Sequence, residues 1–132
     1  MDRLFLDANI LVSAAQQPNA LLAQFWKLKD VMLCSSQYAL QEARLNLRDE
    51  TQKLRLARLA QKLQLFDAHP RELPREAVLP PKDAPILLAA IEARATHLIT
   101  GDLQHFGPYF RKTIGGILVL TPSRYLKMHR SK

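Results

Sequence analysis

The stretch Leu4-Phe5-Leu6-Asp7-Ala8-Asn9 decides the fold, because a short apolar run ends there in an acidic residue. A second apolar run, His97-Leu98-Ile99-Thr100, ends in Gly101-Asp102. Both runs are typical of buried strands of a parallel sheet. Each delivers a carboxylate to the carboxyl edge of that sheet, where ligands bind in open α/β proteins. Two charged groups at one edge predict a site for a hard metal ion.

Apolar strand-like segments alternate with helical ones along the rest of the chain. Strands are also predicted at Val31–Cys34 and Gly116–Leu120, and helices from Pro18 to about Lys29, after Ser35 or Ser36, from Thr51 to Leu65, from Asp83 to Ala95 and from Pro122 to His129. The stretch from Phe66 to Lys82 is irregular, with a short strand expected near Ala77–Leu79. This alternation predicts an α/β protein with three α/β/α layers and a central parallel sheet of about 4–5 strands.

Length and composition indicate a single domain over residues 1–132. The net charge of +7 favours a polyanionic partner, with nucleic acid first. The only cysteine, Cys34, lies in an apolar run, which indicates a packed thiol and excludes an internal disulfide. No signal peptide is recognisable, and no run reaches the roughly 18 apolar residues of a membrane span. A cytoplasmic protein that does not enter membranes is therefore expected.

Four acidic residues fall at the ends of predicted elements or on inward positions: Asp7, Glu42, Asp83 and Asp102. Right-handed crossovers can bring all four above one edge of the sheet. Clustered carboxylates repel one another, so the arrangement is unfavourable without a cation. Oxygen ligands without histidine or cysteine partners suit Mg²⁺ or Mn²⁺.

Each acid also has a purely structural alternative. Asp83 precedes a helix and can serve only as its N-cap. Glu42 can be a solvated helix residue, and Asp102 can be a turn aspartate. The four residues taken together favour the metal site over these separate explanations.

Four segments give the chain a resemblance to the PIN domain family, a metal-dependent nuclease fold related to flap-type nucleases. They are residues 4–14 (LFLDANILVSA), 41–44 (QEAR), 82–90 (KDAPILLAA) and 98–102 (LITGD). The resemblance covers nearly the whole chain and maps the acids of the family onto Asp7, Glu42, Asp83 and Asp102. The polar residue that accompanies the first acid of the family maps onto Asn9.

The resemblance implies hydrolysis of RNA phosphodiester bonds with one or two Mg²⁺ or Mn²⁺ ions. It implies that Asp7 and Asp102 bind metal directly, that Asp83 and Glu42 do so directly or through water, and that Asn9 and Thr100 hold these groups in place. Basic residues flanking the site are then candidates for RNA binding: Arg44, Arg48, Arg111 and Lys112. Within bacteria, many single-domain PIN proteins of this size resemble VapC-type toxins. For this chain, that resemblance implies a homodimer and a cognate antitoxin.

The chain departs from the family where many members have another acid shortly after the final aspartate. His105 stands there, and it either binds or orients a phosphate or metal-bound water, or packs beside Phe106. Asn46, one helical turn after Glu42, is a further candidate. Two other functions stay open. One is an inactive PIN-like module that binds RNA or protein, and the other is a phosphotransferase of the haloacid-dehalogenase type, for which Asn9 replaces a needed aspartate.

Overall fold

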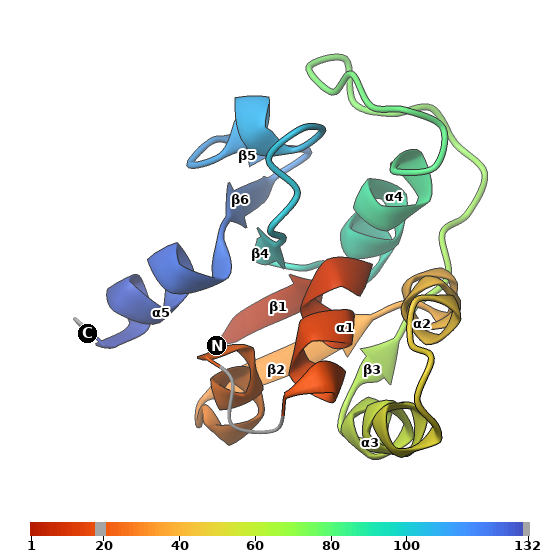
Figure 1. Ribbon diagram of the computed structural model, residues 1–132. Helices are drawn as coiled ribbons and strands as arrows, with labels where there is room; N and C mark the ends of the chain where they lie inside the picture. The colour runs from red at the N-terminus through yellow and green to blue at the C-terminus, as the bar shows by residue number, and fades with distance from the viewer. Residues whose placement is uncertain (18–20, 131–132) are drawn as a thin grey trace.

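Strands and helices alternate in the computed structural model, which describes residues 1–17 and 21–130 (Figure 1). The N-terminal elements are β1 (Asp2–Leu6), α1 (Ala8–Gln16), the 3-10 helix η1 (Leu21–Lys27), β2 (Val31–Ser35), α2 (Gln37–Leu45), α3 (Glu50–Ala60) and β3 (Gln64–Leu65). The C-terminal elements are α4 (Ala84–Glu92), β4 (His97–Ile99), the 3-10 turn η2 (Gly107–Tyr109), β5 (Thr113–Ile114), β6 (Ile117–Leu120) and α5 (Pro122–Arg130). The predicted α/β class is confirmed.

The sheet has six strands in the order β3-β2-β1-β4-β6-β5. All neighbours pair in parallel except β5 and β6, which are antiparallel. The prediction of about 4–5 strands was therefore too low. Two of the six strands have only two residues each, which is too short to give a hydrophobic pattern.

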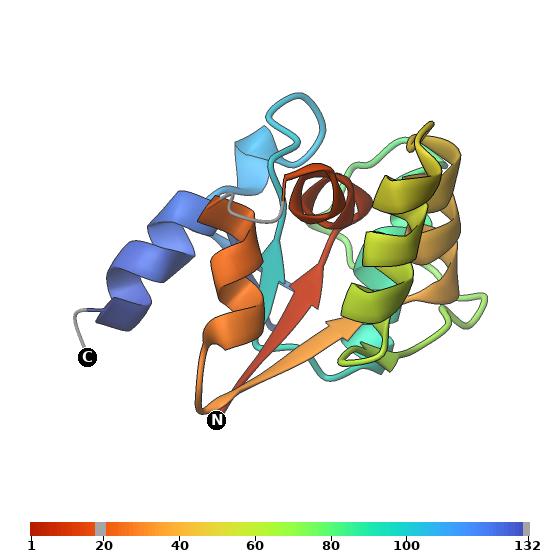
Figure 2. The ribbon, with the colours of Figure 1, turned by 60° about the horizontal axis from the view of Figure 1, so that its bottom comes forward.

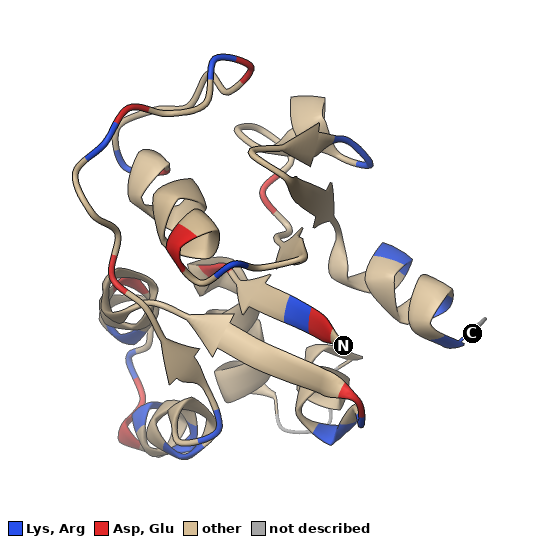
Figure 3. Ribbon diagram, turned by 180° about the vertical axis from the view of Figure 1, so that it is seen from behind, with Lys and Arg blue, Asp and Glu red and all other residues tan. Residues whose placement is uncertain are grey.

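The chain reverses direction across the sheet between β1 and β4. From β1 it moves outward through β2 to β3, then returns by α4 to β4 on the other side of β1. Because crossovers of this kind are right-handed, α1 and α4 belong to opposite faces of the sheet. Figure 1 shows α1 in front of the strands, and Figure 3, from behind, shows the strands in front of α1. The carboxyl ends of β1 and β4 therefore mark the topological switch point of the sheet, where the strand order reverses.

The core forms around β1 and the buried face of α4. Leu4, Phe5 and Leu6 are fully buried, as expected for a central strand covered by helices on both faces. Five consecutive residues of α4, Ile86–Ala90, are also buried. On the far side, α5 lies beside η1 (Figure 2), where the rings of Phe25 and Tyr125 stack with centroids 5.9 Å apart.

Several predicted boundaries were wrong. The helix predicted from Pro18 to Lys29 is a 3-10 helix over Leu21–Lys27, and Pro18 itself lies outside the described residues. The three-residue repeat of a 3-10 helix places Leu22, Phe25 and Leu28 on one side. These side chains pack against the core although they do not form the apolar stripe of an α-helix.

The predicted helix from Thr51 to Leu65 ends at Ala60, and Gln64–Leu65 instead pairs with the end of β2. No strand forms at Ala77–Leu79. There the Tyr109 hydroxyl, rather than a neighbouring strand, accepts the N–H of Val78 at 2.7 Å. The strand β5 was missed altogether. It pairs with β6 through Gly115 and Gly116, whose φ values of 56° and 83° suit a tight hairpin turn.

Cys34 is buried as a free thiol, as predicted. None of the helices within residues 1–17 and 21–130 has both the length and the apolar character needed to span a bilayer.

Candidate metal centre

The candidate site lies at the switch point between β1 and β4. Asp7 directly follows β1, and Thr100, Gly101 and Asp102 directly follow β4. The two strands pair in register, with Leu6 opposite Ile99, and the Asp7 N–H donates to the Ile99 carbonyl at 3.1 Å. The two aspartates therefore leave the sheet side by side.

Asp7 is buried and held by three donors. Its Oδ1 accepts the N–H of Ala8 at 2.7 Å, and its Oδ2 accepts the Thr100 hydroxyl at 2.7 Å and the Asn9 amide at 3.1 Å. Burial nevertheless raises the pKa of Asp7 to about 6, and the charges of Asp83 and Asp102 push in the same direction. The fold thus holds a carboxylate whose charged form it stabilises poorly.

Asn9 and Thr100 connect the two strand ends. The Asn9 amide donates to the Thr100 hydroxyl at 3.3 Å as well as to Asp7, and Asn9 Oδ1 accepts the N–H of Gly101 at 3.0 Å. The fully buried Thr100 hydroxyl also accepts the N–H of Asp102 at 3.1 Å. Through these bonds, Asn9 and Thr100 fix Asp7 and Asp102 relative to each other. The family resemblance implies such a role for Asn9 and Thr100.

Asp102 uses one carboxylate oxygen in the turn and directs the other at His105. Its Oδ1 accepts the N–H groups of Gln104 and His105, both at 3.1 Å, as a turn aspartate does. Its Oδ2 lies 2.9 Å from His105 Nδ1. Burial by itself raises the pKa of Asp102, but the His105 N–H and ring outweigh it, so the net pKa is lowered.

Asp83 does not act as the helix cap that its position suggests. It sits at the N-cap of α4 but makes no side-chain capping bond. Its Oδ2 is buried and accepts no hydrogen bond from any residue the structure describes, although His105 Nδ1 lies 3.1 Å away. Burial raises the pKa of Asp83, opposed by His105 and reinforced by Asp102. An orphaned carboxylate oxygen of this kind is costly unless a cation or another donor reaches it.

Glu42 approaches the site from α2 and is half-buried. Its charge contributes to the raised pKa of Asp83. One turn earlier, Tyr38 donates its hydroxyl to the Lys82 carbonyl at 2.7 Å, which ties α2 to the residue before Asp83. Burial, followed by the effects of Glu42, Asp83 and Asp7, raises the pKa of Tyr38 to about 12. Glu42 therefore lies close enough to Asp83 and Tyr38 to influence both electrostatically.

The donor set fits a divalent cation. Single atoms of Asp83, Asp102 and His105 lie within 4.8 Å of one another, and Asp7 and Glu42 act on the same carboxylates electrostatically. Burial and neighbouring carboxylates raise the pKa values of Asp7 and Asp83, and the buried Oδ2 of Asp83 accepts no hydrogen bond from the described residues, so a bound ion would stabilise both groups. The site can hold a divalent cation through oxygen, with one nitrogen within reach.

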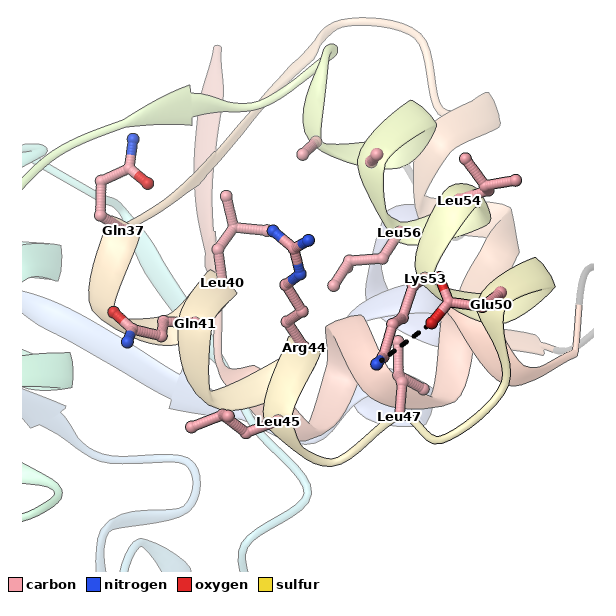
Figure 4. Close-up of a pocket in the computed structure, with 12 residues that line it drawn as sticks. Gln37, Leu40, Gln41, Arg44, Leu45, Leu47, Glu50, Lys53, Leu54 and Leu56 are labelled. Carbon is pink, nitrogen blue, oxygen red and sulfur yellow. Dashed lines mark ion pairs between the residues drawn. The ribbon is translucent and has the colours of Figure 1, made fainter.

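The other candidates lie elsewhere. The Asn46 amide donates to the Glu42 carbonyl at 2.8 Å, so this side chain closes the end of α2. Arg44 lines a groove of about 680 Å³ between α2 and α3, among Leu40, Leu47 and Lys53 (Figure 4). Three further basic candidates are exposed in loops: Arg48, Arg111 and Lys112. Further Lys and Arg residues belong to α3 and α5, marked blue on the ribbon in Figure 3.

Two residues take a larger part in the site than the sequence analysis predicted. His105 was given two alternatives, and in the structure its ring faces Asp83 and Asp102 while Phe106 enters the core. Tyr38 was not among the predicted site residues. Its spacing of four residues from Glu42 was the available signal, because such residues share a helix face.

Comparison with known proteins agrees with this architecture. A sequence profile described as PIN domain matches residues 3–104. No curated protein matches the sequence significantly.

Solved structures with the same fold include VapBC2, VapBC-1 and FitAcB. VapBC2 from Rickettsia felis, bound to a DNA fragment from its promoter, has a TM-score of 0.68 and 19% identity, over 90% of this chain and 98% of that chain. VapBC-1 from nontypeable Haemophilus influenzae has a TM-score of 0.59 and 16% identity, over 92% and 98%. FitAcB from Neisseria gonorrhoeae has a TM-score of 0.50 and 19% identity, over 91% and 98%. At such identities the likeness shows the fold alone. The profile match, which spans most of the sequence, carries the assignment: this chain belongs to the PIN domain family.

Proposed function

We propose that this protein is a metal-dependent endoribonuclease that hydrolyses RNA phosphodiester bonds at the Asp7, Glu42, Asp83 and Asp102 site. The single observation that carries the proposal is the buried Oδ2 of Asp83, which lies among other carboxylates and accepts no hydrogen bond from the described residues. His105 Nδ1, 3.1 Å away, pairs with this oxygen only when the imidazole is protonated. Helix capping does not explain the side chain either, because Asp83 makes no capping bond. A cation at this position would offset both the repulsion and the missing hydrogen bond.

The chain's own residues have distinct roles in this proposal. Asp7, Asp83, Asp102 and Glu42 would hold one or two Mg²⁺ or Mn²⁺ ions. Thr100 and Asn9 keep Asp7 in one orientation through the hydrogen bonds described above. When bound, such an ion polarises a phosphate and lowers the pKa of a water that attacks it.

RNA as substrate follows from charge and from membership of the PIN family. The net charge of +7 attracts a polyanion, while the acidic site repels phosphate until cations are bound. Arg44, Arg48, Arg111 and Lys112 stay candidates for backbone contacts, because all four are exposed. An enzyme acting on cellular RNA would work in the cytoplasm.

The cellular role proposed is that of a toxin held by a cognate antitoxin. Support comes from the solved neighbours with this fold, which are VapBC and FitAB complexes. Such a toxin would be a homodimer. Co-expression with the product of an adjacent gene, followed by co-purification and light scattering, tests both points. A monomer that retains no neighbour-encoded protein would contradict this role and leave the nuclease proposal intact.

The first experiment is cleavage of labelled single-stranded and structured RNA with Mn²⁺, with Mg²⁺ and with EDTA. We expect cleavage that requires metal and disappears in Asp7→Asn. Asp67→Asn is the matched control, because Asp67 is an exposed acid in the irregular segment after β3. Metal-independent cleavage, or full activity in Asp7→Asn, would contradict the proposal. A folded protein that binds metal and RNA without cleaving would favour the inactive binding module instead.

A further inference from the structure

His105 occupies a position that the nuclease proposal does not explain. It lies one residue beyond the stretch matched by the PIN profile, in the turn that follows β4. Its side chain is mostly buried, and Nδ1 lies 2.9 Å from Asp102 Oδ2 and 3.1 Å from Asp83 Oδ2. A single ring nitrogen therefore faces two carboxylates from different elements.

Asp83 supplies an independent sign that a ligand belongs at this point. The residue is 8% exposed, and its Oδ2 accepts no hydrogen bond from the described part of the chain. His105 Nδ1, 3.1 Å away, forms an ion pair with this oxygen only when the imidazole is protonated, and a neutral imidazole leaves it without a donor. An unsatisfied buried acceptor beside another carboxylate and a nitrogen is an arrangement that a cation would complete.

The turn holds His105 in this orientation. Asp102 Oδ1 accepts the N–H groups of Gln104 and His105, so the backbone that carries the ring is tied to the same aspartate. The other oxygen of Asp102 remains directed at the ring. Cis ligands of an octahedral ion with 2.0–2.1 Å bonds are about 3.0 Å apart, close to the separations of these oxygens from Nδ1.

We propose that His105 Nδ1 is a direct metal ligand together with Asp83 and Asp102, and that it makes the site prefer Mn²⁺ and later first-row transition ions over Mg²⁺. The inference rests on the metal site of the proposed function and adds a ligand and a metal preference to it. Imidazole nitrogen suits transition ions, whereas Mg²⁺ takes oxygen ligands. An aspartate at position 105 would give an all-oxygen set and remove the preference.

The test uses the spectrum of bound Mn²⁺ rather than enzyme activity. Electron spin echo modulation detects the ¹⁴N nucleus of an imidazole bound directly to Mn²⁺. We expect this coupling in the wild type and in His69→Asn, an exposed histidine paired with Glu92, and its loss in His105→Asp and His105→Asn. Calorimetric titration should show the ratio of Mn²⁺ to Mg²⁺ affinity falling at least about tenfold in His105→Asp.

The outcomes separate this inference from the proposed function. Wild-type protein that binds Mn²⁺ without ¹⁴N coupling would overturn the role of His105 and leave an all-oxygen metal site standing. An unchanged affinity ratio in folded His105→Asp would do the same. Wild-type protein that binds neither Mn²⁺ nor Mg²⁺ would overturn the proposed function as well. Because the decisive spectrum is that of the wild type, the test does not depend on either variant folding.

Discussion

The acidic site and the groove between α2 and α3 differ in almost every physical property. The groove is large and open, about 680 Å³, with leucine and alanine side chains and the Lys53–Glu50 ion pair at 3.6 Å along its wall (Figure 4). The acidic site gathers carboxylates around His105, and the buried Oδ2 of Asp83 accepts no hydrogen bond from the described residues. The groove costs the fold little, whereas the acidic site destabilises it.

This difference teaches that chemistry is better located by energetic cost than by the size of a hollow. Hydrophobic residues at a surface are common and need no function. Buried carboxylates that raise one another's pKa values are rare, because folding alone selects against them. The following predictions test whether the two regions are as separate in function as they are in character.

The largest effect is expected from Asp102→Asn. The change removes one charge from the site while the turn can keep its hydrogen bonds through the remaining carbonyl oxygen. Metal-dependent RNA cleavage should fall at least about a thousandfold, measured as initial rates under saturating Mn²⁺. Asp49→Asn is the control, since Asp49 only caps α3 and asparagine caps equally well. Comparable rates for the two variants would contradict a catalytic site at β4.

A smaller effect is expected from metal on stability. Mn²⁺ at one hundred times its Kd should stabilise the wild type by about 2.7 kcal/mol, because only the folded chain assembles the site. Asp83→Asn should lose most of this gain, seen as a smaller rise in Tm on adding Mn²⁺. The same rise in Asp83→Asn and wild type would place the ion elsewhere.

The fold was largely predictable from residue patterns because long periodic elements dominate it. The apolar β1 and the nearly all-apolar α4 could be recognised from the sequence, and so could the carboxylates at the ends of the strands. The failures were local. The Gly115-Gly116 pair could have predicted the hairpin that contains β5. By contrast, β3 has only two residues and forms because it pairs with β2.

The site was predictable as a set of acids but not as a geometry. Sequence spacing placed Asp7 and Asp102 at one edge, because parallel strands end together. It did not indicate whether Asp83 caps its helix, or which way the His105 ring turns. Both depend on the path of the irregular segment before α4 and of the turn after β4, where no periodicity constrains the chain.

The next smaller effect is the gain in stability, about 1–2 kcal/mol, expected when Asp7 is replaced by Asn. Its folded pKa of about 6 exceeds the ordinary value of 3.8, so the folded chain binds this proton more tightly than the unfolded chain. Stability of the metal-free protein should therefore fall as pH rises from about 4 to about 6, by roughly 3 kcal/mol from this group alone. Asp7→Asn removes the penalty but turns an amide toward the Asn9 donor, leaving a net gain of about 1–2 kcal/mol at pH 7.5.

Urea unfolding in EDTA at several pH values measures this gain. The advantage of Asp7→Asn over wild type should shrink steadily as the pH is lowered from 7 to 4. A gain that stays constant over this range would mean that the Asp7 charge is not what destabilises the fold.

The smallest effect is expected in the groove. Leu45 is 78% exposed, so Leu45→Gln removes little buried apolar surface and keeps a good helix former in α2. The free energy of unfolding should change by no more than about 0.5 kcal/mol. The cleavage rate should also stay unchanged, because none of the site carboxylates lines the groove. If cleavage instead fell tenfold at unchanged stability and metal affinity, RNA would have to cross the groove. Arg44 beside Leu45 would then be the first residue to test as a phosphate contact, through the salt dependence of RNA binding.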